Sequence, residues 1–314
     1  MKTLKRALAF VTAGVLLLLL LTQCAPQPSG APETADGVTE ALTAEENPGA
    51  EPAEGEPETD EAGGLSFLLN EDGKSYSVYK GTCDETDIVI PPTYKGKPVT
   101  VIGKNAFSYS YGNLISVVIP DSVKVIGENA FCACTGLTDV TLGTGVTCIE
   151  ENAFFQCENL KSILIPDSVT EIGEKAFSAC KSLVSVSIGK GVTVIGTGVF
   201  ADCAALPEVT IPDSVTRIGE KAFSGCSRLA RITVPDGLTR IEANAFSGTG
   251  YVNGKGNREN GVLYLGCHLI VAEPSFSGTC AIREGTSCIA DYAFKACAGL
   301  TEVTIPDSVT YIGE

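Results

Sequence analysis

The segment LKSILIPDSVTEIGEKAFSACKS, which runs from Leu160 to Ser182, determines the architecture of this 314-residue chain. Apolar residues stand at fixed places within it, and these are Leu160, Ile163, Ile165, Val169, Ile172, Ala176 and Phe177. The alternation from Leu160 to Ile165 predicts a short strand. Pro166 and Asp167 end this strand, because the pair favours a turn and proline offers no amide hydrogen to a strand ladder.

The second half of the segment predicts two further elements. Val169–Ile172 is interpreted as a second short strand, which Gly173 ends. The stretch Glu174–Cys180 has room for about one helical or 3-10 turn before the chain reverses. A unit of this size buries its apolar side chains only against neighbouring units above and below it.

The unit recurs along most of the chain. Its phenylalanine follows Ala in every unit but one, at Phe107, Phe131, Phe154, Phe177, Phe200, Phe223, Phe246 and Phe294. Five of the intervals between these residues are 23 residues long, while the first is 24 and the last is 48. A fixed period of about 20 to 50 residues is the mark of a solenoid built from stacked units.

The consensus LxxVxIPxxVxxIGxxAFxxCxx resembles the bacterial leucine-rich repeat of the BspA type, and the resemblance covers residues 88–314. It implies a β-rich repeat solenoid, a right-handed superhelix of ~23-residue units with short strands and short helical or 3-10 turns. We expect about nine units, of which the last is incomplete. This unit stops at Glu314, where its siblings continue with Lys-Ala-Phe. We therefore expect the sequence to be truncated, or a fragment of a longer protein.

Two irregular segments accompany the repeats. Residues 64–87 resemble the lead-in hairpin of the same family, with Asp72-Gly73 at its turn. This hairpin is expected to cap the first unit, whose strand edge would otherwise be unpaired. An insertion at about 247–279 contains a Gly- and Asn-rich loop and a hairpin-like pair, Val262–Leu265 and His268–Ala272. Because long loops often carry binding functions, the insertion is a second place to look for one.

Residues 1–23 have the features of an export signal. A basic start at residues 2–6 precedes an apolar run at residues 7–21, which is too short to cross a bilayer as a helix. The sequence at residues 21–24, Leu-Thr-Gln-Cys, resembles the lipobox of bacterial lipoproteins, although Gln departs from the small residue usual there. The resemblance implies that Cys24 is lipidated. An uncleaved N-terminal anchor is the alternative, and both interpretations place the rest of the chain outside the cytoplasm.

Residues 24–63 are predicted to form a disordered acidic tether rich in Pro and Glu. From residue 25 to residue 63 there are eleven acidic residues, no Lys or Arg and no aromatic residue. Such a segment cannot bury enough apolar surface to offset its ordering entropy, and its like charges repel one another. We expect it to hold a folded body away from a membrane.

Composition argues against several classes of function. The net charge of −16 argues against nucleic acid as a partner, because phosphate binding needs clustered Lys and Arg. His268 is the only histidine, and no nucleophile is identifiable beside it, so no catalytic residue is predicted. Neither Cys132-x-Cys134 nor Cys267-His268 has zinc-site spacing, so no metal is expected, and His268 is interpreted as a surface residue beside a packed cysteine. We predict no cofactor and no enzyme activity.

Six of the 13 cysteines stand three residues after a repeat phenylalanine, at Cys134, Cys157, Cys180, Cys203, Cys226 and Cys297. In a solenoid these residues fall into one column, about 4.7–4.9 Å apart. The resemblance places them in a position that takes Asn or Cys in leucine-rich repeats, where the side chain turns inward to backbone groups. A ladder of buried free thiols is therefore preferred to disulfide bonds, which are the alternative in an exported protein and would distort the repeat.

The outward positions of the first strand of each unit form a polar strip, because strand side chains alternate between two faces. The strip consists of Ser116, Val118, Asp139, Thr141, Ser162, Leu164, Ser185, Ser187, Glu208, Thr210, Arg231 and Thr233, with Glu302 and Thr304 in the last unit. Either it binds a protein or a glycan on another cell or matrix, or it is only a soluble β face.

The family resemblance implies adhesion. We therefore expect a non-catalytic, lipid-anchored protein of the bacterial cell surface, which presents an extended repeat face for adhesion or for protein or glycan recognition. A rigid face of this kind loses little conformational freedom on binding. The alternative is a structural spacer, or a fragment of a larger surface protein whose functional domain lies beyond residue 314.

Overall fold

The computed structural model describes residues 58–59, 64–110 and 113–314. The predicted export signal (residues 1–23), Cys24 and nearly all of the predicted tether (residues 24–63) lie outside these residues. Within the tether, only β1 (Glu58–Thr59) is described, and it pairs antiparallel with β2 (Ser66–Leu69).

An antiparallel hairpin precedes the repeats. It is formed by β2 and β3 (Tyr76–Tyr79), and the carboxylate of Asp72 closes its turn by accepting the backbone N–H groups of Lys74 at 2.7 Å and Ser75 at 3.0 Å. β3 then pairs in parallel with β6 (Lys97–Ile102), the first strand of a ladder that runs into the repeats. The hairpin therefore covers the backbone edge of the first unit.

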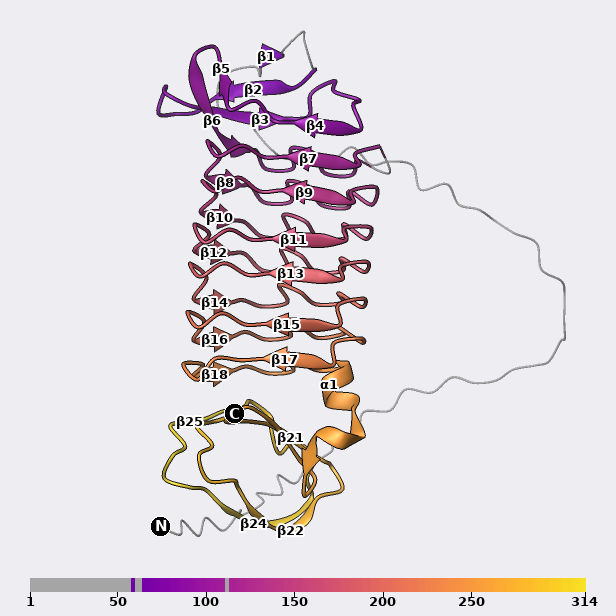
Figure 1. Ribbon diagram of the computed structural model, residues 1–314, viewed down its shortest axis with the longest axis vertical. Coiled ribbons are helices and arrows are strands. Elements are labelled where there is room, and N and C mark those ends of the chain that lie inside the picture. The colour runs from indigo at the N-terminus through magenta and orange to yellow at the C-terminus, as the bar shows by residue number, and fades with distance from the viewer. Residues whose placement is uncertain (1–57, 60–63, 111–112) are drawn as a thin grey trace, which may run out of the picture. The chain divides into compact units, whose positions relative to one another are not determined.

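Each repeat unit contributes two short strands, one to each of two ladders (Figure 1). The first ladder contains β4 (Asp87–Val89), β7 (Ser116–Val118), β9 (Asp139–Thr141), β11 (Ser162–Leu164), β13 (Ser185–Ser187), β15 (Glu208–Thr210) and β17 (Arg231–Thr233). The second ladder contains β6, β8 (Val125–Ile126), β10 (Cys148–Ile149), β12 (Glu171–Ile172), β14 (Val194–Ile195), β16 (Arg217–Ile218) and β18 (Arg240–Ile241), and the short β5 (Thr93–Tyr94) pairs antiparallel with β6. Paired strands of successive units are parallel, as in Ser162 opposite Ser185. The predicted β-rich repeat solenoid is confirmed.

A continuous stack of phenylalanine rings runs through the buried core of the repeats. The rings of Phe107, Phe131, Phe154, Phe177, Phe200, Phe223 and Phe246 follow one another with centroid separations of 5.1 to 5.6 Å and interplanar angles of 3° to 16°. All seven residues are buried. Because each ring touches only the rings of the adjacent units, the core has the one-dimensional character of a solenoid.

The segment that follows the second strand of each unit differs from the expected helical turn. In the unit of Phe177, residues 174–179 form a series of turns, in which Ser178 N–H donates to the Lys175 carbonyl at 2.9 Å. Lys175 and Ala179 have positive φ values, 53° and 59°. A right-handed helix requires negative φ throughout, so these two residues reverse the chain without forming one.

The insertion and the last units form the C-terminal part of the described chain. The insertion contains α1 (Gly250–Asn253), the 3-10 turn η1 (Lys255–Asn257), β19 (Arg258–Glu259), β20 (Val262–Leu265) and β21 (His268–Ala272), of which β20 and β21 pair antiparallel. The units that follow contain β22 (Ser277–Ala281), β23 (Cys288–Ile289), β24 (Gly299–Thr304) and β25 (Tyr311–Ile312), and a second apolar cluster packs among them. No helix within the described ranges has the length and apolar character that crossing a bilayer requires.

Candidate functional site

The outward strip predicted from the sequence lies along the first ladder. Of its twelve residues from Ser116 to Thr233, eleven are exposed, and Ser116 is half-buried. The side chains between them, such as Ile163 and Val209, point into the core and are buried. The strip therefore presents two outward side chains per unit at a regular interval.

The two halves of the strip differ in chemistry. In the N-terminal half, Val89, Val118 and Leu164 are exposed apolar residues, with exposed fractions of 69%, 39% and 63%. In the C-terminal half, the same column holds hydroxyl side chains, at Ser187, Thr210 and Thr233. An exposed valine or leucine alone needs no explanation, but three among the first four members of one column, with Thr141 between Val118 and Leu164, form an interrupted apolar stripe on an otherwise polar face.

Two charged side chains on the first ladder, Asp87 and Glu208, interact with strip residues of the next unit. Ser116 donates a hydrogen bond to Asp87 at 2.5 Å, and the hydrogen bonds from Ser116 and Thr86 lower the pKa of that carboxyl group. Arg231 forms an ion pair with Glu208 at 2.6 Å, on the exposed surface of β15 and β17. An exposed pair of this kind contributes little to stability, so its main effect is to leave the strip nearly neutral.

Within the described residues the first ladder is interrupted twice, between β9 and β11 and between β13 and β15, and the second interruption borders the hollow described below. Strands β11 and β13 form one sheet and β15 and β17 form another, with no strand pairing from β13 to β15 among the described residues. Pro207 is one cause. In adjacent units, the residue at this position donates to the unit before it, as Val184 N–H does to the Lys161 carbonyl at 2.9 Å. Pro207 has no N–H, so the Val184 carbonyl receives no such bond.

A Gly-x-Gly sequence is the second cause. Gly189 and Gly191 replace the Pro and Ser of the usual Pro-Asp-Ser turn. A Cβ atom at Gly189 would lie 2.3 Å from the carbonyl oxygen of Pro166, so only glycine permits this approach to the preceding unit. Lys190 N–H also donates to Asp167 at 2.8 Å. The loop is thus held against the unit before it and leaves space on the side of the unit after it.

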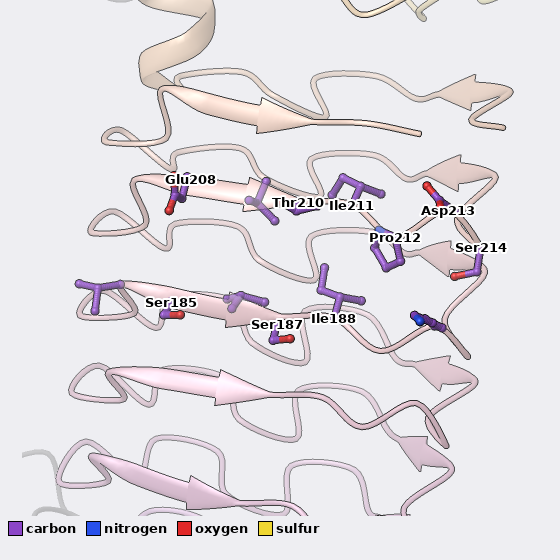
Figure 2. A pocket seen from close by; sticks show the side chains of 13 residues that line it. Ser185, Ser187, Ile188, Glu208, Thr210, Ile211, Pro212, Asp213 and Ser214 are labelled. Carbon is purple, nitrogen blue, oxygen red and sulfur yellow. The ribbon is translucent and has the colours of Figure 1, made fainter. Parts of the chain in front are cut away.

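A hollow of about 580 Å³ occupies this space. Figure 2 shows Ser185 and Ser187 of β13 beside Glu208 and Thr210 of β15, with the turn that contains Asp213 at the far end. Its full lining comprises Val184, Ser185, Val186, Ser187, Ile188, Lys190, Glu208, Val209, Thr210, Ile211, Pro212, Asp213 and Ser214. The hollow therefore includes four residues of the predicted strip.

The lining of the hollow is a mixture of polar and apolar groups. Its functional groups are hydroxyls, one ammonium group from Lys190 and two carboxylates from Glu208 and Asp213, beside apolar surface from Val184 and Pro212. Glu208 is already paired with Arg231. No histidine or cysteine and no aromatic ring lines the hollow. The set offers hydrogen bonds, charge and apolar contact to a ligand.

The predicted ladder of buried thiols is confirmed. In five consecutive units the thiol donates to the carbonyl of the phenylalanine in the previous unit, as Cys157 does to Phe131 at 3.2 Å. These cysteines, Cys134, Cys157, Cys180, Cys203 and Cys226, are fully buried, and the twelve cysteines in the described ranges are free thiols. Cys297 makes the equivalent bond to the carbonyl of Glu273 at 3.3 Å but is only half-buried. The column therefore completes the backbone hydrogen bonding of the turns.

The interpretation of His268 as a surface residue beside a packed cysteine was wrong. His268 is fully buried, whereas Cys267 is partly exposed. Cys267 occupies the turn between β20 and β21, and His268 begins the strand that packs against β23. Across the described part of the chain, no group of three or more His, Cys, Asp or Glu side chains is arranged to hold a metal ion.

The sequence interpretation missed the hollow, although a signal was present. Gly189-Lys190-Gly191 departs from the Pro-Asp-Ser turn of neighbouring units, and Pro207 stands where they have an amide donor. The same kind of turn, Gly143-Thr144-Gly145, precedes the other break of the first ladder, between β9 and β11, so the Gly-x-Gly turn is the signal of an interrupted ladder. The strip residues were identified by alternation alone, which gives their face but not the spacing between their strands.

Comparisons with known proteins agree with this architecture. A model of the BspA type leucine-rich repeat region matches in six copies, at residues 100–216, 193–255 and 275–314. The leucine-rich repeat protein of T. pallidum is 32% identical to this chain, with a TM-score of 0.55, and the match covers 59% of this chain and 86% of that one. A leucine-rich cell surface protein of Faecalibacterium prausnitzii is also 32% identical, over 83% of this chain and 74% of its own, with a TM-score of 0.46. Among curated proteins, none matches. Since the family model matches more than half of the sequence, this chain belongs to the BspA-type leucine-rich repeat family.

Proposed function

We propose that this chain is a non-catalytic recognition protein of the bacterial cell surface, which binds a protein ligand through the outward strip. The observation that carries the proposal is the hollow between β13 and β15, which lies on the predicted strip. In this proposal, lipidated Cys24 attaches the protein to the membrane and residues 24–63 act as its tether. Membership of a repeat family that builds extended surfaces supports the proposal.

A protein ligand fits the hollow better than a glycan does. The lining combines hydroxyls of Ser185, Ser187 and Thr210 with apolar surface of Val184 and Pro212. A polypeptide matches this mixture with backbone groups and alternating side chains. The lining contains no aromatic ring, so it offers no flat apolar platform for a sugar face.

The apolar stripe extends the site toward the N-terminal units. Leu164 lies on β11, whose neighbour in the ladder is β13, and the hollow begins at β13. Apolar anchors near the centre of an interface contribute most of the binding free energy, while polar residues around them give complementarity. We therefore place the centre of the site at Leu164 and the hollow.

Binding of the full-length protein to immobilised extracellular-matrix proteins, to glycans and to intact cells tests the proposal. Saturable binding to a protein ligand that persists at high salt is expected, because an apolar contact is not screened by ions. Saturable binding to glycans but to no protein would show that the ligand is a glycan and not a protein. Absence of saturable binding to every surface would contradict recognition and favour a structural spacer.

A further inference from the structure

The turn between β20 and β21 presents a thiol in a fixed position. Gly266 and Cys267 form this two-residue turn, and Gly266 has a φ of 58°, which glycine adopts without strain. The Arg283 guanidinium donates to the Gly266 carbonyl and lies 4.4 Å above the Tyr264 ring centroid. Arg283 also pairs with Glu259 at 2.9 Å. The backbone that carries Cys267 is therefore held by a cation anchored on two sides.

Two polar side chains contact the sulfur of Cys267. The hydroxyl of Ser287 donates to it at 3.2 Å, and Nε2 of His268 lies 3.6 Å from it. Nδ1 of the same imidazole lies 3.4 Å from the Ser287 hydroxyl, so the three groups form one cluster. A hydroxyl that donates to sulfur stabilises the thiolate, which is the nucleophilic form of cysteine.

His268 is placed to accept a proton from this thiol. Burial lowers the pKa of His268, against the smaller opposing effects of the Pro235 carbonyl and the charge of Asp236. The imidazole is therefore neutral at pH 7, and in the tautomer that carries its hydrogen on Nδ1 the lone pair of Nε2 is free to accept the Cys267 proton. A neutral imidazole within hydrogen-bond reach of a thiol can act as its general base.

The other two partly exposed cysteines of the described chain lack such surroundings. Burial raises the pKa of Cys148 to about 11, and the carboxylates of Glu171 and Glu150 raise it further. Cys297 donates its own proton to the Glu273 carbonyl, and burial raises its pKa. Among these three thiols, only that of Cys267 has a hydroxyl donor directed at its sulfur and an imidazole beside it.

We propose that Cys267 is a modification site, at which the thiol forms a mixed disulfide with a low-molecular-weight disulfide. In this step, the sulfur of Cys267 attacks one sulfur of the reagent, a new S–S bond forms and the S–S bond of the reagent breaks. The proton of Cys267 passes to His268 and from there to the departing thiolate. The Cys267 sulfur is oxidised and the departing thiol is the reduced product, so the reagent itself supplies the oxidising equivalent.

Reaction of the reduced full-length protein with oxidised glutathione at neutral pH tests the proposal. Peptide mapping by mass spectrometry measures the rate of adduct formation at each cysteine without any substitution. We expect Cys267 to react about tenfold faster than Cys148 or Cys297. Equal rates at the three positions, or no adduct at Cys267, would overturn the assignment.

Two variants distinguish activation of the Cys267 thiol by its neighbours from simple solvent exposure of that thiol. Ser287→Ala removes the hydroxyl donor from the sulfur without filling the turn, and it should slow the reaction of Cys267 several-fold. Cys297→Ser is the matched control and should leave the rate at Cys267 unchanged. If Ser287→Ala reacts as fast as the unmodified sequence, while its circular dichroism spectrum is unchanged, the cluster does not activate the thiol and the proposal fails.

Discussion

The thiol of Cys180 donates a hydrogen bond to the main-chain carbonyl of Phe154, 3.4 Å away in the preceding unit. The same bond recurs in four other units, so the cysteine column ties each turn to the one before it. The thiol is fully buried, and this burial raises the pKa of Cys180 to about 12, well above the usual range of a cysteine thiol. The folded state therefore keeps the protonated thiol.

The cysteine column makes stability sensitive to alkaline pH. Below pH ~9 the thiol is protonated in both states, and its contribution to stability is fully present. As pH rises from about 9 to about 12, the unfolded chain releases the proton while the folded chain keeps it, so stability falls by about 1.4 kcal/mol per pH unit for such a thiol. Denaturant unfolding at a series of pH values measures this slope.

Cys180→Ala tests the assignment of the slope to this residue. At pH 7 we expect the variant to lose about 1–2 kcal/mol, because the hydrogen bond and the packing of the sulfur are removed. Above pH 9 the difference from the unmodified sequence should narrow, because Ala has no proton to release. A difference that stays constant up to pH 11 would show that the pKa of Cys180 is not raised by folding.

The phenylalanine stack is expected to dominate the stability of the solenoid. Phe177 lies between Phe154 and Phe200, at centroid separations of 5.2 and 5.6 Å. Phe177→Ala should cost about 3–5 kcal/mol, because it leaves a cavity in a core that cannot collapse around it. Phe294→Ala is the comparison, since Phe294 is half-buried and packs in the C-terminal apolar cluster. Chemical denaturation should give the smaller loss for Phe294→Ala.

The close approach of the Gly189 loop to the previous unit can be tested by adding one methyl group. A Cβ at Gly189 would lie 2.3 Å from the Pro166 oxygen, whereas at Gly196 the nearest atom would be 3.6 Å away. Gly189→Ala should therefore destabilise the protein by about 1–3 kcal/mol, and Gly196→Ala should be neutral or stabilising by up to about 1 kcal/mol. Equal effects on the midpoint of unfolding would contradict the tight packing that opens the hollow.

The left-handed turn residues offer a stabilising substitution. Lys175 has a φ of 53°, and the equivalent position holds asparagine in four other units, at Asn105, Asn129, Asn152 and Asn244. Asparagine tolerates this conformation better than lysine, so Lys175→Asn should raise stability by about 0.5–1 kcal/mol. Lys161→Asn, at an exposed position without positive φ, is the control. Thermal unfolding distinguishes them, and an equal gain from Lys161→Asn would refute the conformational explanation.

Periodicity was sufficient to predict the repeat architecture. The fixed 23-residue interval predicted the phenylalanine and cysteine columns, because each unit repeats the same contacts with its neighbours. Periodicity could not give the local path of the chain. The second strand was expected at Val169–Ile172, but Val169 N–H closes a turn onto the Pro166 carbonyl at 3.1 Å, and only Glu171–Ile172 is a strand.

The candidate site could be predicted only in part. Side-chain alternation placed residues such as Leu164 and Ser187 on one outward face. The hollow depends instead on tertiary packing. It lies where Gly189 packs against Pro166 of the preceding unit and where Pro207 of the following unit has no N–H to donate to the Val184 carbonyl. The burial of His268 likewise depends on the parallel pairing of β21 with β23. Because β21 lies in the insertion, outside the repeat pattern, periodicity could not predict this pairing.

Comparison of two exposed apolar residues tests recognition by the strip most directly. Leu164→Glu places a charge in the apolar stripe, next to the hollow, while Leu69→Glu places one at an exposed position on β2, away from the strip. The affinity of each full-length variant is measured for the extracellular-matrix protein that binds the unmodified protein most tightly, at one fixed salt concentration. We predict that Leu164→Glu weakens binding at least about tenfold, which corresponds to 1.4 kcal/mol, and that Leu69→Glu binds as the unmodified sequence does. Unchanged binding by Leu164→Glu would contradict the assignment of the strip as the recognition face.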